Sequence, residues 1–366
     1  MEHNNVKDIR NSGQSIWLDF FDREIMNSGK LKTLIDQDGV SGVTSNPSIF
    51  EKAIHASSDY DEDIKTLSRE KNNSEDIFLG LAIKDIRRAA DLFKPVYEKS
   101  NGEDGFVSLE VSPRLALDTK GTIKQAKKLW QAVDRKNIMI KIPGTAEGLP
   151  AIRKCTSEGI NINITLLFGL PRYQQVTDAY ISGLEDRANA GHSIDEIVSV
   201  ASFFLSRIDV MVDPMLEQKR LNKLKGEAGI ALAKTAYQIY KSVFTSARFK
   251  KLEGIGARKQ HVLWASTSSK DPSFRDVKYV EALIGAETID TIPLETLEAF
   301  RDHGEAKKSL EDNTDKATEV LALLDENGID INAIAQKLEE EGIKKFSVSY
   351  DKLLKEIEEK KMKIFA

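Results

Sequence analysis

Eight short apolar segments alternate with helical stretches along the 366-residue chain, and this alternation most constrains its fold. The segments are rich in Val, Ile, Leu and Phe, and several end at a polar residue or at proline, which is typical of buried parallel strands. Strands that alternate with helices form parallel sheets, and eight such units close into a barrel. We therefore predict an α/β fold, a (β/α)8 TIM barrel, with strands at residues 15–19, 39–46, 106–111, 137–144, 159–168, 197–203, 260–265 and 288–292.

The rest of the chain is predicted to be helical. The length alone would suggest two domains, but one barrel of roughly 250 residues with added helices fits equally well. We expect a single domain spanning residues 1–366, with helical insertions at about 48–100 and 208–258 and a helical C-terminal segment at about 305–366. A helix is expected at 20–36, and another opens at Thr296. Within the C-terminal segment we expect breaks at Asn327-Gly328 and at Gly342.

The charge and the cysteine content limit which binding partners and which cellular compartment we expect. The net charge is −5, and both signs are mixed along the chain, which gives no reason to expect nucleic acid or a membrane surface as partner. The polar first fifteen residues indicate no signal peptide. A single cysteine, Cys155, is expected in the core, and it excludes an intrachain disulfide framework, so a reducing cytoplasm is the expected compartment. Charged runs such as 339–341 are predicted to be solvated helix faces.

One lysine, Lys141, lies inside the apolar segment 137–144. Burial disfavours the charged form of an amine, and a neutral lysine is a nucleophile towards ketones. The alternative is an edge-strand lysine whose ammonium reaches water. The segment alone does not decide between the two.

Polar residues stand at or near the ends of five other predicted strands: Asp19, Asn46, Glu110, Asn163 with Thr165, and Ser202. Any one of them could be a turn former or a helix cap. In an α/β barrel, however, the C-terminal strand ends meet at the mouth of the active site. We therefore expect these side chains to converge around Lys141.

This set of residues fits Schiff-base chemistry. A lysine amine attacks a ketone, water is lost, and the iminium accepts electrons during carbon–carbon cleavage. Each step moves a proton, for which Asp19 and Glu110 are the available carboxylates. The five histidines show no metal-ligand spacing, and no glycine-rich nucleotide motif is present.

A phosphate site is predicted beside these residues. Arg207 follows Ser202, and a loop containing Ser268 and Lys270 follows the seventh predicted strand. Barrels often bind phosphate near their last loops, where hydroxyls and a cation meet. A serine-rich surface turn is the alternative, but the pairing with Arg207 favours phosphate.

Five segments together resemble the transaldolases in their longer bacterial form, and the likeness extends over nearly the whole chain. The segments are GVTSNPS at 42–48, LEVSPRL at 109–115, IKIPGT at 140–145, NINITLLF at 161–168 and WASTS at 264–268. The resemblance implies transfer of a dihydroxyacetone unit in the pentose phosphate pathway. The donor would be sedoheptulose 7-phosphate or fructose 6-phosphate, and the acceptor an aldose phosphate such as glyceraldehyde 3-phosphate or erythrose 4-phosphate. It also implies that the reaction needs no metal and no organic cofactor.

The resemblance also implies a role for each catalytic residue. Lys141 would form the Schiff base, and Asp19 would be the acid and base for the C4 hydroxyl of the donor. Glu110, together with Thr165, would position or activate the water used in imine formation and hydrolysis.

The resemblance also implies which residues bind the two ends of the substrate. Asn46 and Asn163 would hold the dihydroxyacetone hydroxyls, and Ser202 and Arg207 would serve the other end of the substrate and its phosphate. The chain departs from the shorter transaldolases after the seventh strand. There they carry a second phosphate-binding arginine, whereas this loop offers Ser268, Ser269 and Lys270, and a lysine binds phosphate as a point charge.

Two other functions remain open from the residues alone. A Schiff-base aldolase, a lyase, would use the same lysine on fructose 6-phosphate but release the three-carbon fragment without an acceptor. A catalytically silent barrel would only bind sugar phosphates. The sequence does not decide between a monomer and a homodimer.

Overall fold

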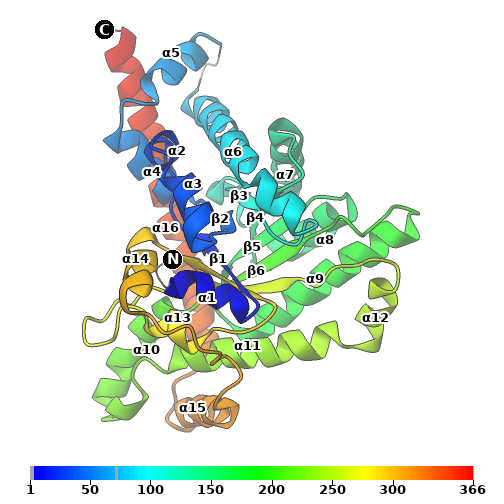
Figure 1. Cartoon of the computed structure of the whole chain (residues 1–366), viewed down its shortest axis with the longest axis vertical. Helices are drawn as coiled ribbons and strands as arrows, with labels where there is room; N and C mark the ends of the chain where they lie inside the picture. Colours follow the sequence, from blue (N-terminus) through cyan, green and yellow to red (C-terminus); the bar gives the residue numbers. More distant parts are fainter. Residues whose placement is uncertain (1–3, 71–72, 366) are drawn as a thin grey trace.

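The computed structural model describes residues 4–70 and 73–365, and its centre is a closed barrel of eight parallel strands in chain order (Figure 1). The predicted (β/α)8 fold is confirmed, with a strand in each predicted segment. The strands are β1 (Gln14–Leu18), β2 (Gly42–Val43), β3 (Val107–Glu110), β4 (Ile138–Pro143), β5 (Ile162–Leu167), β6 (Ser199–Phe204), β7 (His261–Ala265) and β8 (Thr288–Ile292).

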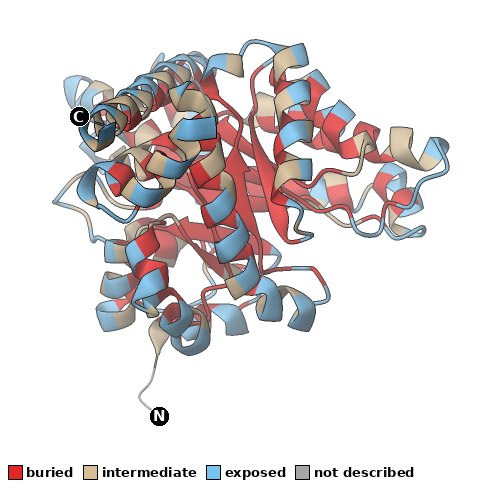
Figure 2. Ribbon diagram, turned by 90° about the horizontal axis from the view of Figure 1, so that it is seen from above, coloured by how far each residue is buried: buried red, intermediate tan, exposed pale blue. Residues whose placement is uncertain are grey.

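Helices surround the barrel and bury their inner faces against it, so that the buried residues gather at the centre and the exposed ones outside (Figure 2). No helix in the described part of the chain is long and apolar enough to cross a membrane. The α-helices are α1 (Asn5–Asn11), α2 (Arg23–Asn27), α3 (Lys30–Thr33), α4 (Pro47–Ala56), α5 (Asp61–Glu70), α6 (Ser74–Lys99), α7 (Thr119–Val133), α8 (Gly148–Ser157), α9 (Leu170–Asn189), α10 (Ser206–Gln218), α11 (Ala228–Phe244), α12 (Ala247–Glu253), α13 (Lys278–Ala282), α14 (Leu294–His303), α15 (Thr314–Glu326) and α16 (Ile331–Phe365).

Strand β2 is much shorter than the predicted 39–46. Only Gly42 and Val43 pair with β1, because the chain turns at Asn46 to enter α4, where Pro47 cannot donate to a sheet ladder. The glycine is required there, since a Cβ at Gly42 would lie 2.6 Å from the ring of Trp17. The early end of β2 leaves Asn46 in a turn at the barrel mouth.

The helix expected at 20–36 is interrupted. It is divided into α2 and α3, followed by a π-helical turn at Leu34–Asp38, because Gly29 adopts a φ of 78° that ends the first helical segment. Its predicted inner residues, such as Ile25 and Leu31, are buried nevertheless. Helix α14 begins at Leu294 instead of Thr296, because Pro293 caps it with a φ of −63°.

The predicted break at Gly342 is wrong, since α16 runs without interruption through it. A Cβ at Gly342 would lie 2.9 Å from Leu166 Cδ2, so the glycine allows α16 to approach the barrel closely. The break at Asn327-Gly328 is confirmed, because α15 ends at Glu326 and Gly328 has a φ of 69°.

The C-terminal helix α16 docks firmly on the rest of the molecule. It lies along α4 and α5 (Figure 1) and also contacts α10 and β5. Leu353 and Ile357 are fully buried in this contact, as expected. The predicted solvated face is wrong for Glu339, which is only 8% exposed and lies 3.3 Å from Arg172. Helix α16 is therefore a wall of the barrel mouth.

Candidate active site

A cavity of about 1160 Å³ opens at the C-terminal ends of the strands. Its walls come from the barrel, from α4, from α10 and from α16. Seven of the ten predicted site residues line it: Asp19, Asn46, Lys141, Ser202, Arg207, Ser268 and Lys270. The other three, Glu110, Asn163 and Thr165, are buried below its surface.

Three residues on neighbouring strands form what we call the floor of the cavity: Glu110, Lys141 and Asn163. They are direct partners in the register of β3, β4 and β5, so their side chains stand in one row. Lys141 is 4% exposed, and its Nζ donates to the carbonyl of Ser45 at 3.2 Å. The interpretation of Lys141 as an edge-strand lysine in contact with water is therefore wrong.

Glu110 is the carboxylate next to the lysine, with Oε2 3.7 Å from Lys141 Nζ. Burial raises the pKa of Glu110 to about 7, although the nearby ammonium opposes the shift. Within residues 4–70 and 73–365, neither carboxylate oxygen of Glu110 nor the hydroxyl of Thr165 has a hydrogen-bond partner. These groups can accept or hold a proton near Lys141.

Two side-chain hydrogen bonds hold the amide of Asn163. Its Nδ2 donates to Ser108 Oγ at 3.0 Å, and its Oδ1 accepts from Ser202 Oγ at 2.7 Å. Ser202 lines the cavity while Asn163 lies behind it. The amide of Asn163 is thus fixed in one orientation beside Lys141.

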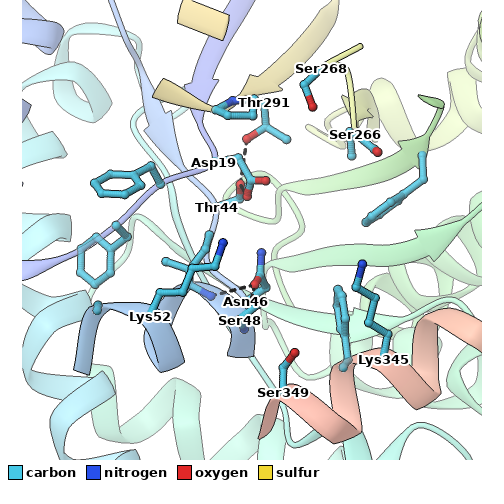
Figure 3. A pocket seen from close by; sticks show the side chains of 18 of the residues that line it. Asp19, Thr44, Asn46, Ser48, Lys52, Ser266, Ser268, Thr291, Lys345 and Ser349 are labelled. Carbon is cyan, nitrogen blue, oxygen red and sulfur yellow. Dashed lines mark hydrogen bonds between the residues drawn. The ribbon is translucent and has the colours of Figure 1, made fainter. Parts of the chain in front are cut away.

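Asp19 faces the cavity from the residue after β1. Its Oδ1 accepts from Thr44 Oγ1 at 2.9 Å, and Thr44 in turn bonds to Thr291 Oγ1 at 2.7 Å, as Figure 3 shows. Burial raises the pKa of Asp19, and the charge of Lys141 and the bond from Thr44 act in the opposite direction. A carboxylate with a raised pKa and a fixed orientation suits proton exchange.

Asn46 combines the two roles that the sequence left open. Its Oδ1 caps α4 by accepting from the backbone N–H groups of Ser48 and Ile49 at 3.0 and 3.1 Å. Its amide nitrogen points into the cavity (Figure 3). The helix cap therefore fixes an N–H donor towards the site.

Apart from Lys141 and Arg23, which is ion-paired with two aspartates, four cations line the cavity, and we call them the rim: Lys52, Arg207, Lys270 and Lys345. Arg207 is at the start of α10, and Lys270 follows β7 and donates to Ser268 Oγ. Loss of solvent lowers the pKa of both Arg207 and Lys270. Sequence reasoning found Arg207 and Lys270 but missed Lys52 and Lys345.

The cavity residues that were not predicted differ in whether the sequence contains a signal for them. Thr44 lies two residues before Asn46 in a predicted strand, so strand alternation could have indicated that both face the same side. Lys52 and Lys345 stand in helical stretches where no local pattern marks a residue that faces the cavity. No group of three or more metal-ligating His, Cys, Asp or Glu residues occurs in the described ranges.

Comparison with known proteins assigns the family. A family model described as Transaldolase/Fructose-6-phosphate aldolase matches residues 16–357. The chain belongs to the transaldolase family. A transaldolase of Thiobacillus denitrificans is 47% identical over 97% of this chain and 99% of its own length. A transaldolase of Trichodesmium erythraeum is 45% identical over 100% of this chain and 99% of its own.

The predicted family is thus confirmed, and so is the enzyme class, a transferase. A relative named Transaldolase 2 from a Nostoc species, 44% identical over 98% of both chains, agrees with it. Because these transaldolases align along their whole length, the barrel and α16 are both parts of the family alignment.

Proposed function

We propose that this chain transfers a dihydroxyacetone unit from sedoheptulose 7-phosphate or fructose 6-phosphate to an aldose phosphate, through a Schiff base on Lys141. The observation that carries the proposal is the buried amine of Lys141 at the bottom of a large cavity, 3.7 Å from Glu110. Glu110 is the only carboxylate within 4 Å of this amine among the described residues. An amine so placed is accessible to a ketone but screened from bulk water.

The reaction begins at the floor. The neutral amine of Lys141 attacks the C2 carbonyl of the donor, and Glu110 is placed to take the proton that the ammonium must lose. The carbinolamine then loses water, and a proton from Glu110 makes that water a good leaving group. Thr165, which is buried on β5 two residues after Asn163, the register partner of Lys141, holds the same water.

Cleavage follows at the side of Asp19. Its carboxylate removes the proton of the C4 hydroxyl, and the C3–C4 bond breaks. The electrons of that bond enter the iminium to give an enamine on Lys141, and C4 becomes the aldehyde carbon of an aldose phosphate, which leaves. Asn46 and Ser202 hold the hydroxyls of the three-carbon unit, supported by Asn163 behind Ser202. This differs from the roles that the resemblance implies, in which Asn163 binds these hydroxyls directly and Ser202 serves the other end of the substrate. The enamine adds to the acceptor aldehyde, and Asp19 returns its proton to the new hydroxyl. Hydrolysis of the iminium then frees Lys141.

Arg207, Ser268 and Lys270 bind the substrate phosphate in this proposal. They line the cavity that Lys141 also lines but are not part of the floor, which suits the far end of an extended sugar phosphate. We also place the protein in the cytoplasm, on the grounds of its single cysteine and of sugar phosphate substrates. The single-domain organisation stays a prediction.

Borohydride trapping tests the proposal. With fructose 6-phosphate present, reduction should leave a three-carbon adduct on Lys141, detected by peptide mass spectrometry. The Lys136→Ala variant, which changes an exposed lysine before β4, is the control and should trap as the wild type does. An unmodified Lys141 peptide would mean that the barrel only binds its ligand.

A second measurement separates transfer from simple cleavage. Fructose 6-phosphate is supplied with and without erythrose 4-phosphate, and sedoheptulose 7-phosphate should form only with the acceptor. Equal consumption of the donor in both reactions would identify a lyase instead.

A further inference from the structure

The rim contains more positive charge than the predicted phosphate residues supply. Its cations come from four distant parts of the chain, namely α4, α10, the loop after β7 and α16. Within the described ranges, the side chains of Lys52, Arg207 and Lys345 form no hydrogen bond and no ion pair. Glu295 and Glu341 line the same cavity but form no ion pair with any rim residue. Asp19 and Glu295 act on the charges of Arg207 and Lys270 only from beyond ion-pair distance. Among the described residues the rim is therefore a cluster of like charges that forms no ion pair.

Lys345 lines the same cavity as Arg207. The charge of Arg207 is the main cause that lowers the pKa of Lys345, followed by loss of solvent and by Lys270 and Lys52. Positive charges that line the same cavity repel each other, and a bound anion reduces that repulsion. A phosphate carries up to two negative charges and three acceptor oxygens, so it can bond to several cations together.

Helix α16 fixes Lys345 at this position. Phe346 and Tyr350 of the same helix are buried, and Gly342 lies against Leu166 one turn earlier. Lys345 and Ser349 are four residues apart and therefore share a helix face. Figure 3 shows both side chains pointing into the cavity from α16. The face offers an ammonium and a hydroxyl, both of which donate to phosphate oxygens.

We propose that Lys345 is a specificity-determining residue that binds the substrate phosphate together with Arg207, so that the C-terminal helix completes the substrate site. This inference rests on the proposed function. It gives a role to α16, which contributes nothing to the floor. It also supplies a third cation for the phosphate, beside Arg207 and Lys270, where the loop after β7 has a lysine in place of an arginine.

The test compares Lys345→Met with Lys344→Met. Lys344 is the exposed neighbour on the same helix and does not line the cavity. For Lys345→Met, KM for fructose 6-phosphate should rise about tenfold with kcat within about twofold, which is the loss expected from one charge-assisted bond. Dihydroxyacetone has no phosphate, so its half-saturating concentration for borohydride trapping should stay unchanged. Lys345→Arg should restore most of the affinity, and Lys344→Met should match the wild type.

An unchanged KM in Lys345→Met would overturn the inference, and so would an equal loss for dihydroxyacetone. Binding of inorganic phosphate, measured as the rise in melting temperature that it causes, provides a second readout. Lys345→Met should reduce this rise and Lys344→Met should not. If the wild type forms no adduct, the proposed function fails, but the phosphate measurement still decides whether Lys345 is part of an anion site.

Discussion

The floor and the rim of the cavity are built in different ways. The floor consists of Glu110, Lys141 and Asn163, which are register partners on three adjacent strands and are all buried. The cations of the rim come from α4, α10, the loop after β7 and α16, which are far apart in the sequence. The three lysines among them are exposed. Hydrogen bonding between strands fixes the floor, whereas the docking of helices and one loop fixes the rim. We infer that the floor determines the chemistry and that the rim selects the substrate.

The largest effect is expected at the floor. Lys141→Ala should abolish turnover, a loss of at least about four orders of magnitude, because it removes the nucleophile. The fold should persist, since the change also removes a buried amine. Steady-state rates and circular dichroism check the two expectations, with Lys136→Ala as the control. Near-normal turnover in Lys141→Ala would refute the inference that the floor determines the chemistry.

The next effect concerns Asp19, which stands between the two regions. Asp19→Asn should lower kcat by roughly two to four orders of magnitude, because the amide cannot accept the C4 hydroxyl proton. Its bond from Thr44 can be kept, so the side chain should stay in place. Trapping of the donor imine should survive, since that step precedes cleavage. If imine formation failed as well, Asp19 would act earlier than we propose.

The pH dependence sharpens the role of Glu110. Its pKa is raised to about 7 by burial, so the carboxylate form that accepts protons is lost as pH falls below about 7. We expect kcat of the wild type to fall by up to tenfold per pH unit below that value. Glu110→Gln should be slower, by roughly ten- to a hundredfold, and should lack this inflection. Rate profiles between pH 5 and 9 would refute the assignment if the inflection persisted in Glu110→Gln.

The smallest effect is expected at the rim. Arg207→Met should raise KM for fructose 6-phosphate about ten- to a hundredfold, with kcat changed only a few fold, because one charge-assisted contact is lost far from the reacting carbon. Arg207→Lys should lose less, since it keeps the charge but not the planar fork. A loss mainly in kcat would place Arg207 with the floor and break the comparison.

The difference between floor and rim also explains what the sequence revealed. All eight strands were located, and their polar ends indicated Lys141, Glu110 and Asn163 correctly as neighbours, because alternation along a strand and the barrel rule fix where such residues face. The length of β2 was missed, since only the pairing with β1 shows that the strand is limited to Gly42 and Val43 before the chain turns into α4. Gly342 was mistaken for a helix break for the same kind of reason.

Only two of the four rim residues could be predicted from the sequence. Arg207 and Lys270 follow strands and were expected at the mouth, but Lys345 lies in a charged helical stretch about 200 residues from Lys141 in the sequence. A lysine on a helix carries no local sign of what the helix packs against. Thr44 and Thr291 are likewise joined to Asp19 only by tertiary contact.

The sequence by itself therefore determined the fold class, the family and the row of residues that performs the chemistry, because strand periodicity and local motifs specify them. Only the tertiary structure decided that α16 closes one wall of the cavity and brings Lys345 into the same cavity as Arg207. The physical reason is that register is set by backbone hydrogen bonds between adjacent strands, whereas the place of a helix depends on side-chain packing between segments far apart in the chain.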